Sequence, residues 1–312
     1  MGLGLLIVVG ALVVNASPSD PLDLAAQRIA TLPADPPGTN NDTHYLVSNE
    51  RRLDLFFDRL PVTRGGVLIG VGAEQLLILA GWTRPDLVVA LDFDPVIVDL
   101  HRVHAALLRH AEDPDAFVAL WADEGRAAEV LAADGALARV TAVHRLAARV
   151  VSTRLVELHE RPWRGKTPRA GPKTFLTDLG QYDIVRSLAK SGRLVAIQGD
   201  LTGDVTLPAL AAALRDHDLL VRTLYLSNAE QYFMYGDGYR RNLLALPMDD
   251  RTVILRTLPG RPRDFEYLSQ RGPHFQGWLQ RPRVRSVYAI RGLAKGAHLV
   301  GETAHRLGPP PK

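Results

Sequence analysis

GGVLIGVGAEQLLILAGWTRPDLVVALDFDPVIVDLH, residues 65–101, is the stretch that decides the fold. Its first apolar run, Val67–Val71, shows no polar alternation, as expected of a strand that is covered on both faces. A glycine turn, a helical segment and a second apolar run, Leu87–Leu91, follow in that order. This strand–turn–helix–strand succession predicts the opening unit of a nucleotide-binding α/β sheet.

Two glycines and one aspartate in this unit are candidate ligand-binding residues. Gly70 and Gly72 lack a Cβ, so the backbone can turn tightly there and a ligand can lie against it. Asp92 ends the second apolar run, where a carboxylate can accept hydrogen bonds from both hydroxyls of a ribose. Asp92 follows Gly72 by 20 residues, close to the spacing that such a unit requires. The alternative is that the glycines only shape a strand-to-helix turn.

The glycine pattern indicates a ligand without phosphates. A dinucleotide fingerprint has a third glycine three residues after the second, and this chain has Gln75 there. Glu74 would place a negative charge where phosphates bind at a helix start. S-adenosylmethionine has a ribose and a sulfonium but no phosphate, so it fits this pattern better than a nicotinamide dinucleotide does.

Polar residues follow four of the expected strands, and ligands of open α/β sheets bind outside the carboxyl ends of the strands. These four ends are Gly70–Gln75, Asp92–Asp94, Gly199–Asp200 and Ser227–Tyr232. In the last, Asn228 offers donors and an acceptor, Glu230 is a candidate base and Tyr232 can donate a hydrogen bond or stack. The alternative is that Asn228 caps a turn, Glu230 is solvated and Tyr232 packs in the core. Glu50, in Ser48-Asn49-Glu50, is a second-rank candidate.

The phrases LIGVGAEQ (68–75) and VVALDFDP (88–95) resemble the first two motifs of the class I S-adenosylmethionine-dependent methyltransferases. The chain is also similar to an uncharacterised bacterial family with a methyltransferase-like domain, through VSNE (47–50), IGVGAEQ (69–75) and LSNAEQYF (226–233). The resemblance implies a Rossmann-like methyltransferase sheet with helices on both faces. It implies that Gly70, Gly72 and Glu74 contact the cofactor, that Asp92 holds the ribose and that Asp200 approaches the adenine amino group. Two positions differ from the family's motif. Leu68 stands where the family usually has an acidic residue, and Glu74 stands where it often has a third glycine.

The chain divides into four predicted parts. Gly2–Val14 is a run of 13 apolar or glycine residues, too short for a membrane span of about 20 residues and typical of a secretory signal core. We therefore expect a signal peptide at 1–16, a linker at 17–42, a Rossmann-like domain at 43–305 and a loose tail at 306–312. Alanine- and arginine-rich residues 112–190 predict a helical insertion. Helical spacing favours a helix over 44–61, and 286–290 resembles a strand.

Composition excludes several functions. There is no cysteine, which removes thiolate nucleophiles, thiolate metal sites and disulfides. A net charge of +3 is too small to argue for nucleic acid. His101 and His104 lie three apart on one helix, but no further ligand has supporting spacing, so we expect no metal site.

A basic segment near the C-terminus is a candidate for contact with a membrane surface. Residues 251–291 hold nine arginines against Asp264 and Glu266. Such a segment can meet anionic lipid headgroups, whereas the alternative is a solvated basic surface. It contains no recognisable nucleic-acid-binding module, so no specific nucleic-acid partner is expected.

Three functions compete at this point. The first is methyl transfer from S-adenosylmethionine to an unknown small-molecule or lipid acceptor. The second is an exported, non-catalytic methyltransferase-like domain that binds a ligand or a protein. The third is a nicotinamide-dependent oxidoreductase, which the missing third glycine disfavours. A cleaved leader would place the protein outside the cytosol, where little S-adenosylmethionine is found. An uncleaved leader would leave the protein cytoplasmic or attached to a membrane, which favours the enzyme.

Overall fold

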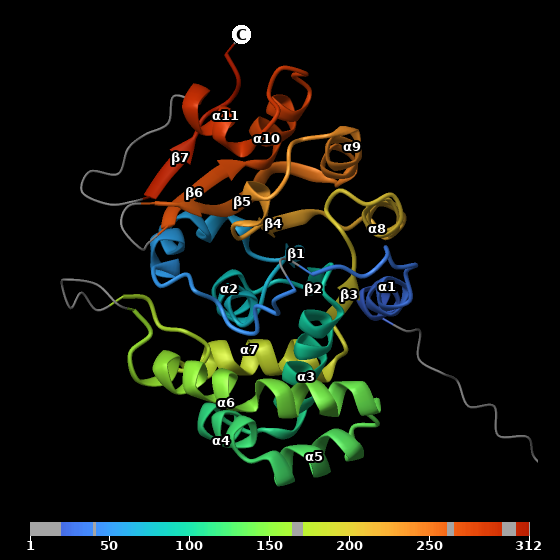
Figure 1. Ribbon diagram of the computed structural model, residues 1–312, viewed down its shortest axis with the longest axis vertical. Helices are drawn as coiled ribbons and strands as arrows, with labels where there is room; N and C mark the ends of the chain where they lie inside the picture. The colour runs from blue at the N-terminus through green and yellow to red at the C-terminus, as the bar shows by residue number, and fades with distance from the viewer. Residues whose placement is uncertain (1–19, 40–41, 164–170, 261–264, 295–303, 312) are drawn as a thin grey trace, which may run out of the picture.

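The centre of the molecule is a seven-stranded, mostly parallel sheet (Figure 1). The structure is a computed structural model that describes residues 20–39, 42–163, 171–260, 265–294 and 304–311. The strand order is β3-β2-β1-β4-β5-β6-β7. Strands β1 to β5 run parallel, β6 pairs antiparallel with β5, and β7 pairs parallel with β6. The strands are β1 (Val67–Gly70), β2 (Leu87–Asp92), β3 (Leu194–Gln198), β4 (Val221–Tyr225), β5 (Met248–Pro259), β6 (Phe265–Arg271) and β7 (Ala304–Leu307).

Helices cover both faces of this sheet because successive strand residues point to opposite sides. Leu68 belongs to one apolar cluster, while Val67 and Ile69 belong to the other. The first face carries α2 (Gln75–Thr83), α3 (Pro95–His110) and α7 (Leu179–Lys190). The second face carries α1 (Pro21–Ala30), α8 (Thr206–Asp216), α9 (Asp237–Ala245), α10 (Gly272–Leu279) and α11 (Val287–Leu293). This arrangement confirms the predicted α/β, Rossmann-like class, and its β3-β2-β1-β4-β5 order is the doubly wound one.

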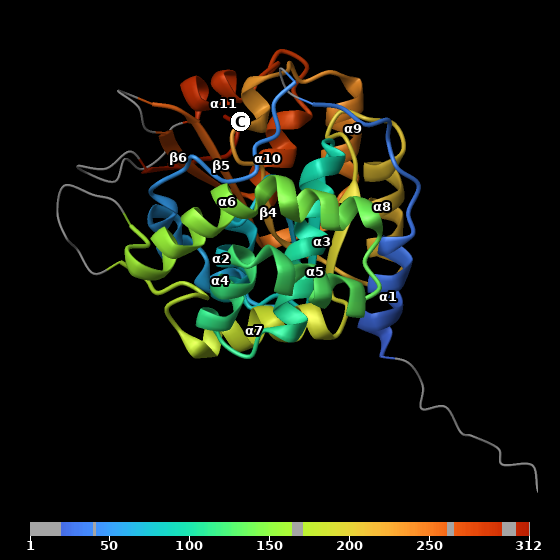
Figure 2. The same cartoon turned by 60° about the horizontal axis from the view of Figure 1, so that its bottom comes forward.

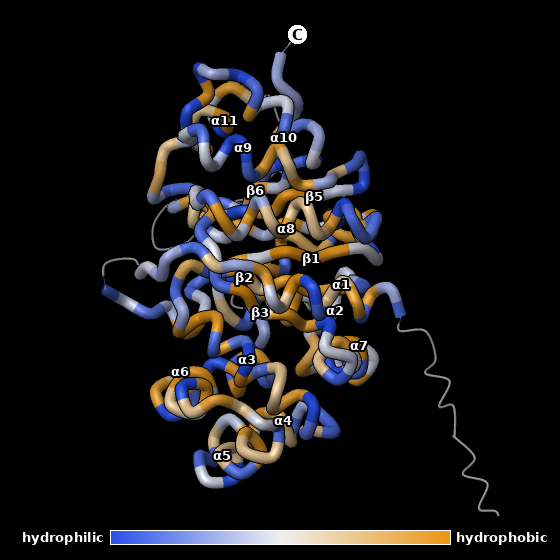
Figure 3. Tube along the Cα trace, turned by 90° about the vertical axis from the view of Figure 1, so that its right-hand side faces the viewer, coloured by the Kyte–Doolittle hydropathy of each residue, from blue (hydrophilic) through white to orange (hydrophobic). Residues whose placement is uncertain are grey.

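The predicted helical insertion is present between β2 and β3. It contains α4 (Pro114–Ala122), α5 (Glu124–Ala133) and α6 (Ala138–Glu160), which pack beside α3. These helices lie at one end of the molecule and α10, α11 and β7 at the other (Figure 1). Every residue of α2 is buried, and its hydrophobic colour continues that of β1 in Figure 3. The helix therefore lies inside the structure, with the sheet on one side and helices such as α7 on the other.

The segment expected to be a linker at 17–42 is instead part of the folded domain wherever it is described. Ala25, Ala26 and Ile29 of α1 are buried, and α1 lies beside α8 (Figure 2). Asp35 is buried and accepts the backbone N–H of Thr206 at 3.2 Å, so it caps α8. The apolar side chains of α1 outweigh the surrounding prolines and aspartates on which the linker prediction rested. The expected signal peptide, 1–16, lies outside the described residues.

Three further local predictions are wrong. Residues 44–52 have no regular secondary structure, and only 3-10 helices follow, η1 (Leu53–Arg59) and η2 (Pro61–Thr63). The expected strand at 286–290 is helix α11, because Val284, Val287 and Ile290 repeat every three residues on a buried face. The tail begins inside strand β7, where Leu307 is buried. Among the described residues, no helix is both long and apolar enough to span a membrane.

Candidate functional site

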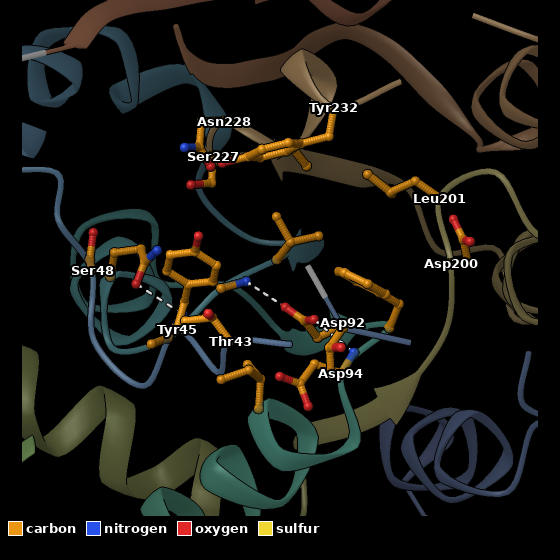
Figure 4. Close-up of a pocket in the computed structure, with 18 of the residues that line it drawn as sticks. Thr43, Tyr45, Ser48, Asp92, Asp94, Asp200, Leu201, Ser227, Asn228 and Tyr232 are labelled. Carbon is orange, nitrogen blue, oxygen red and sulfur yellow. Dashed lines mark hydrogen bonds between the residues drawn. The ribbon is translucent and has the colours of Figure 1, made fainter. Parts of the chain in front are cut away.

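A cavity of about 420 Å³ opens at the carboxyl ends of β1, β2, β3 and β4. Strands β1 and β4 are neighbours in the sheet although the chain passes through β2 and β3 between them. This is the switch point at which doubly wound sheets bind ligands. Figure 4 shows Asp92 and Asp94 on one side of the cavity, with Ser227, Asn228 and Tyr232 across from them. A further part of the wall comes from Thr39 and from residues 43–49, which precede β1.

Gly72 and Asp92 meet at the base of this cavity. Gly72 has φ +89°, a left-handed conformation that favours glycine. Its N–H donates to Asp92 Oδ2 at 3.1 Å, and the N–H of Asp94 donates to Asp92 Oδ1 at 3.0 Å. Burial raises the pKa of Asp92 to about 6. Each carboxylate oxygen accepts one bond from the backbone and can accept another from a ligand in the cavity.

Gly70 and Glu74 are not part of the cavity lining, which corrects the expectation that they contact a cofactor. A Cβ on Gly70 would lie 2.4 Å from Leu76 Cδ1, so this glycine allows β1 to pack closely against α2. Glu74 is buried and points away from the cavity. Its Oε1 lies 2.8 Å from Arg154 Nε on α6, and its Oε2 accepts the N–H of Ser48 at 3.0 Å. Glu74 therefore joins the insertion to the segment that covers the cavity.

Asp200 lines the cavity beyond the end of β3. Its Oδ1 accepts the N–H of Thr202 at 2.7 Å and the Thr202 hydroxyl at 2.8 Å, so the side chain has a fixed direction. Its Oδ2 has no protein partner among the described residues. Leu201 and Phe93 add apolar surface nearby. This part of the wall combines an acceptor for a donor group with a face suited to a flat ring.

The polar residues after β4 divide into two groups. Asn228 and Tyr232 line the cavity. The alternatives of a turn cap for Asn228 and a core position for Tyr232 are wrong, because Asn228 makes no side-chain capping bond and Tyr232 is 53% exposed. Glu230 is buried, and Arg256 Nη1 lies 3.0 Å from its Oε2. Tyr239 donates a hydrogen bond to Glu230 Oε1 at 2.7 Å, as does Tyr235. Since Glu230 faces away from the cavity and its charge is used inside the core, the prediction that it is the base is wrong.

Residues 42–52 form an irregular strap over the cavity. Thr43, Tyr45, Val47, Ser48 and Asn49 of the strap line the cavity. Figure 4 shows Tyr45 and Tyr232 reaching into the space from different sides. The prediction of a helix over 44–61 hid this role, although the polar pattern Ser48-Asn49-Glu50 pointed to the segment.

Glu50 anchors the strap to the sheet. It is fully buried, and its carboxylate accepts hydroxyl bonds from Tyr225 on β4, Thr257 on β5 and Ser227, the last at 2.9 Å. Burial raises the pKa of Glu50 to about 7. Ser227 lines the cavity and has φ +48°, a left-handed conformation that costs free energy for a serine. The Glu50–Ser227 hydrogen bond therefore helps to hold a strained residue in the cavity wall.

The cavity wall is acidic. Asp92, Asp94 and Asp200 line it, and the described lining contains no lysine, arginine or histidine. The backbone donors of the glycine turn are already engaged, because Gly72 N–H bonds Asp92 and Ala73 N–H bonds Gln75 Oε1 at 3.0 Å. Phosphate groups need free donors or cations. The site is therefore suited to neutral or cationic ligands.

The two histidines considered as metal ligands serve the fold. His101 Nε2 donates to the carbonyl oxygen of Gly72 at 2.7 Å, which supports the glycine turn from behind. His104 is completely buried among the rings of Phe117 and Trp121. No group of three or more potential metal ligands occurs in the part of the chain that the structure describes.

The arginines of 251–291 have varied surroundings. Arg256 lies in the core beside Glu230, and Arg291 pairs with Glu266 at 2.8 Å. Arg251 donates to backbone carbonyls of residues 62 and 64. Arg261 and Arg263 lie outside the described residues. Among the described arginines of this segment, Arg256 at least is removed from the surface.

Comparison with known proteins gives a family but no activity. The comparison with curated proteins found no match. Residues 45–302 match the model of a family described as "Domain of unknown function (DUF7790)". That range contains residues 45–52 of the strap, every lining residue except Thr39 and Thr43, and strands β1 to β6. The chain therefore belongs to the DUF7790 family.

Proposed function

We propose that this protein binds S-adenosylmethionine in the cavity at the β1–β4 switch point and transfers its methyl group to a small-molecule or lipid acceptor. The observation that carries the proposal is the meeting of Gly72 and Asp92 at the base of that cavity. A carboxylate at the end of β2, held by the glycine turn after β1, has the position and chemistry to accept both hydroxyls of a ribose.

The neighbouring wall has groups suited to the adenine part of an adenosyl ligand. Asp200 is directed by Thr202 and leaves its Oδ2 for the adenine amino group. Phe93 and Leu201 offer apolar surface for the purine ring. The cavity of about 420 Å³ falls within the range of about 300–1,000 Å³ that is usual for small-ligand sites.

The same wall disfavours a nicotinamide dinucleotide. A pyrophosphate would face Asp92 and Asp94 without a cation among the described lining residues. The N–H groups of Gly72 and Ala73, which would otherwise receive it, bond to side chains of the protein. A sulfonium cofactor carries positive charge and meets no such conflict.

Methyl transfer requires mainly that a nucleophile be aligned with the methyl carbon. Asn228 and Tyr232 lie across the cavity from Asp92, where an acceptor would approach the cofactor (Figure 4). Tyr45 supplies a second ring from the strap. Amide and phenol groups can orient an acceptor through hydrogen bonds and ring contacts.

The chain offers a matched control for a binding test. Asp92 accepts the N–H of Gly72 at the carboxyl end of β2, and Asp86 accepts the N–H of Gly66, at 2.6 Å, just before its amino end. Only Asp92 lines the cavity. Asp92→Asn and Asp86→Asn therefore perturb similar turn contacts at opposite ends of β2.

The experiment is isothermal titration calorimetry with S-adenosylmethionine, S-adenosylhomocysteine and NAD. We expect the adenosyl ligands to bind the wild-type protein and the Asp86→Asn variant alike. Asp92→Asn should weaken them by about 10- to 100-fold, because charge-assisted hydrogen bonds contribute about 1.5–3 kcal/mol. NAD should give no binding heat. Absence of adenosyl binding at millimolar ligand, or equal losses in both variants, would refute the proposal.

A further inference from the structure

We infer that the cavity takes an adenosyl sulfonium whose side chain carries no carboxylate, namely decarboxylated S-adenosylmethionine, in preference to S-adenosylmethionine itself. This inference rests on the proposed adenosyl site and specifies its preferred ligand, because the decarboxylated form keeps the sulfonium methyl group that the proposed transfer needs. S-adenosylmethionine carries a sulfonium, an ammonium and a carboxylate. The decarboxylated form lacks the carboxylate and so has one more net positive charge.

The first argument is the charge of the wall. Asp92, Asp94 and Asp200 line the cavity, and no cationic side chain lines it among the described residues. His44 lies 2.7 Å from Asp94 through Nδ1 but is not itself part of the lining. Like charges in a partly enclosed site repel more strongly than in water. A ligand carboxylate therefore loses free energy in this cavity, whereas an ammonium or a sulfonium gains it.

The second argument is that two backbone donors of the glycine turn are in use and cannot meet a carboxylate. Gly72 N–H and Ala73 N–H bond the side chains of Asp92 and Gln75. Glu74 precedes α2 at its N-terminus, so an acidic residue already occupies the end of the helix that attracts anions.

Two hydroxyl donors of the wall are likewise engaged. Thr202 donates to Asp200 and Ser227 donates to Glu50. The phenols of Tyr45 and Tyr232 and the carboxamides of Asn49, Gln75 and Asn228 remain, and all of them are neutral donors. They can accept from an ammonium as readily as they can donate to a carboxylate, so they do not offset the acidic charge of the wall.

The test compares four ligands by calorimetry at about pH 8 and low salt on the full-length protein. They are 5′-methylthioadenosine, S-adenosylhomocysteine, S-adenosylmethionine and decarboxylated S-adenosylmethionine. The first is uncharged and reports on the adenosyl site alone. We expect decarboxylated S-adenosylmethionine to bind about tenfold more tightly than S-adenosylmethionine, with S-adenosylhomocysteine weaker than both. Added salt should narrow these differences, because it screens charge.

Variants of the wall residues test whether the acidic side chains cause the preference for the decarboxylated ligand. Asp94→Asn and Asp200→Asn should each reduce the affinity ratio between the decarboxylated and the intact sulfonium. Asparagine keeps an oxygen that can cap α3 or bond Thr202, so both variants should fold. Glu112→Gln, an exposed position outside the cavity, should leave the ratio unchanged.

The outcomes separate the inference from the proposed function. If methylthioadenosine binds and depends on Asp92, but intact S-adenosylmethionine binds as tightly as the decarboxylated form, the inference is wrong and the adenosyl site stands. If none of the four ligands binds, both fail. A ratio that persists in Asp94→Asn and Asp200→Asn also overturns the inference, because the acidic wall would then not be its cause.

Discussion

Replacing Glu50 by glutamine should remove a distinct part of the pH dependence of stability. Glu50 is fully buried, and burial raises its pKa from 4.5 to about 7. The folded protein therefore holds the Glu50 proton more tightly than the unfolded chain does. The resulting stabilisation is complete below about pH 4.5 and is lost as the pH rises through 7.

The size of this effect follows from the shift. At about 1.36 kcal/mol per pKa unit, Glu50 should make the folded state about 2 kcal/mol more stable at about pH 5.5 than at about pH 8. Glutamine does not titrate, so the variant lacks this contribution. It fits the same space and can still accept the hydroxyl bonds from Ser227 and Thr257 through its amide oxygen.

Urea denaturation of both proteins across this pH range measures the difference. The free energy of unfolding of the wild type, minus that of Glu50→Gln, should rise by about 2 kcal/mol as the pH falls from about 8 to about 5.5. Other titrating groups, such as His101 and Asp92, are present in both proteins and cancel in the subtraction. A difference that stays constant with pH would show that Glu50 is ionised normally, and the description of the strap anchor would be wrong.

Three other changes test separate parts of the structure. Ribose hydroxyls would favour the charged form of Asp92, whose pKa is about 6, so the affinity for adenosyl ligands should be constant above about pH 7 and fall below pH 6. Titration calorimetry should show no such pH dependence for Asp92→Asn, and its absence in the wild type would count against the ribose contact. Glu230→Ala should lower the free energy of unfolding, measured by chemical denaturation, by about 3–5 kcal/mol, because it leaves the buried Arg256 charge unpaired. The adenosyl affinity of the folded fraction should not change, and a selective loss of affinity would show that Glu230 belongs to the site. His104→Phe should raise the melting temperature, since both ring nitrogens of His104 lack hydrogen-bond partners in the described structure. The gain should grow below pH 6.5, because burial lowers the pKa of His104 in the folded protein. An unchanged or lower melting temperature would mean that the ring nitrogens of His104 have hydrogen-bond partners.

The base of the cavity could be predicted from sequence because its parts are local. Val67–Val71 and Leu87–Leu91 identify adjacent parallel strands, and residues just beyond the carboxyl ends of such strands meet at one edge. The approach of Gly72 to Asp92 follows from this arrangement alone. Asp200 and Tyr232 reach the cavity for the same reason.

The directions of Glu74 and Glu230 could not be predicted in this way. Each follows a strand, as a site residue would, but each has an arginine partner that is distant in sequence, Arg154 and Arg256. Nothing in the local pattern says that a carboxylate will turn inward to such a partner. The strap was hidden for a related reason, because its path depends on contacts of Glu50 with β4 and β5 rather than on its own periodicity.

The Glu74–Arg154 pair limits how this protein can be shortened. Removing the helices between β2 and β3 would delete the guanidinium and leave a solitary carboxylate enclosed beneath the glycine turn. An isolated buried charge of that kind lowers the stability of the folded state by several kcal/mol. The structure most affected would be the glycine turn that orients Asp92. A minimal version of the domain must therefore carry Glu74→Gln or a similar neutral replacement, whereas trimming the exposed loops should be tolerated.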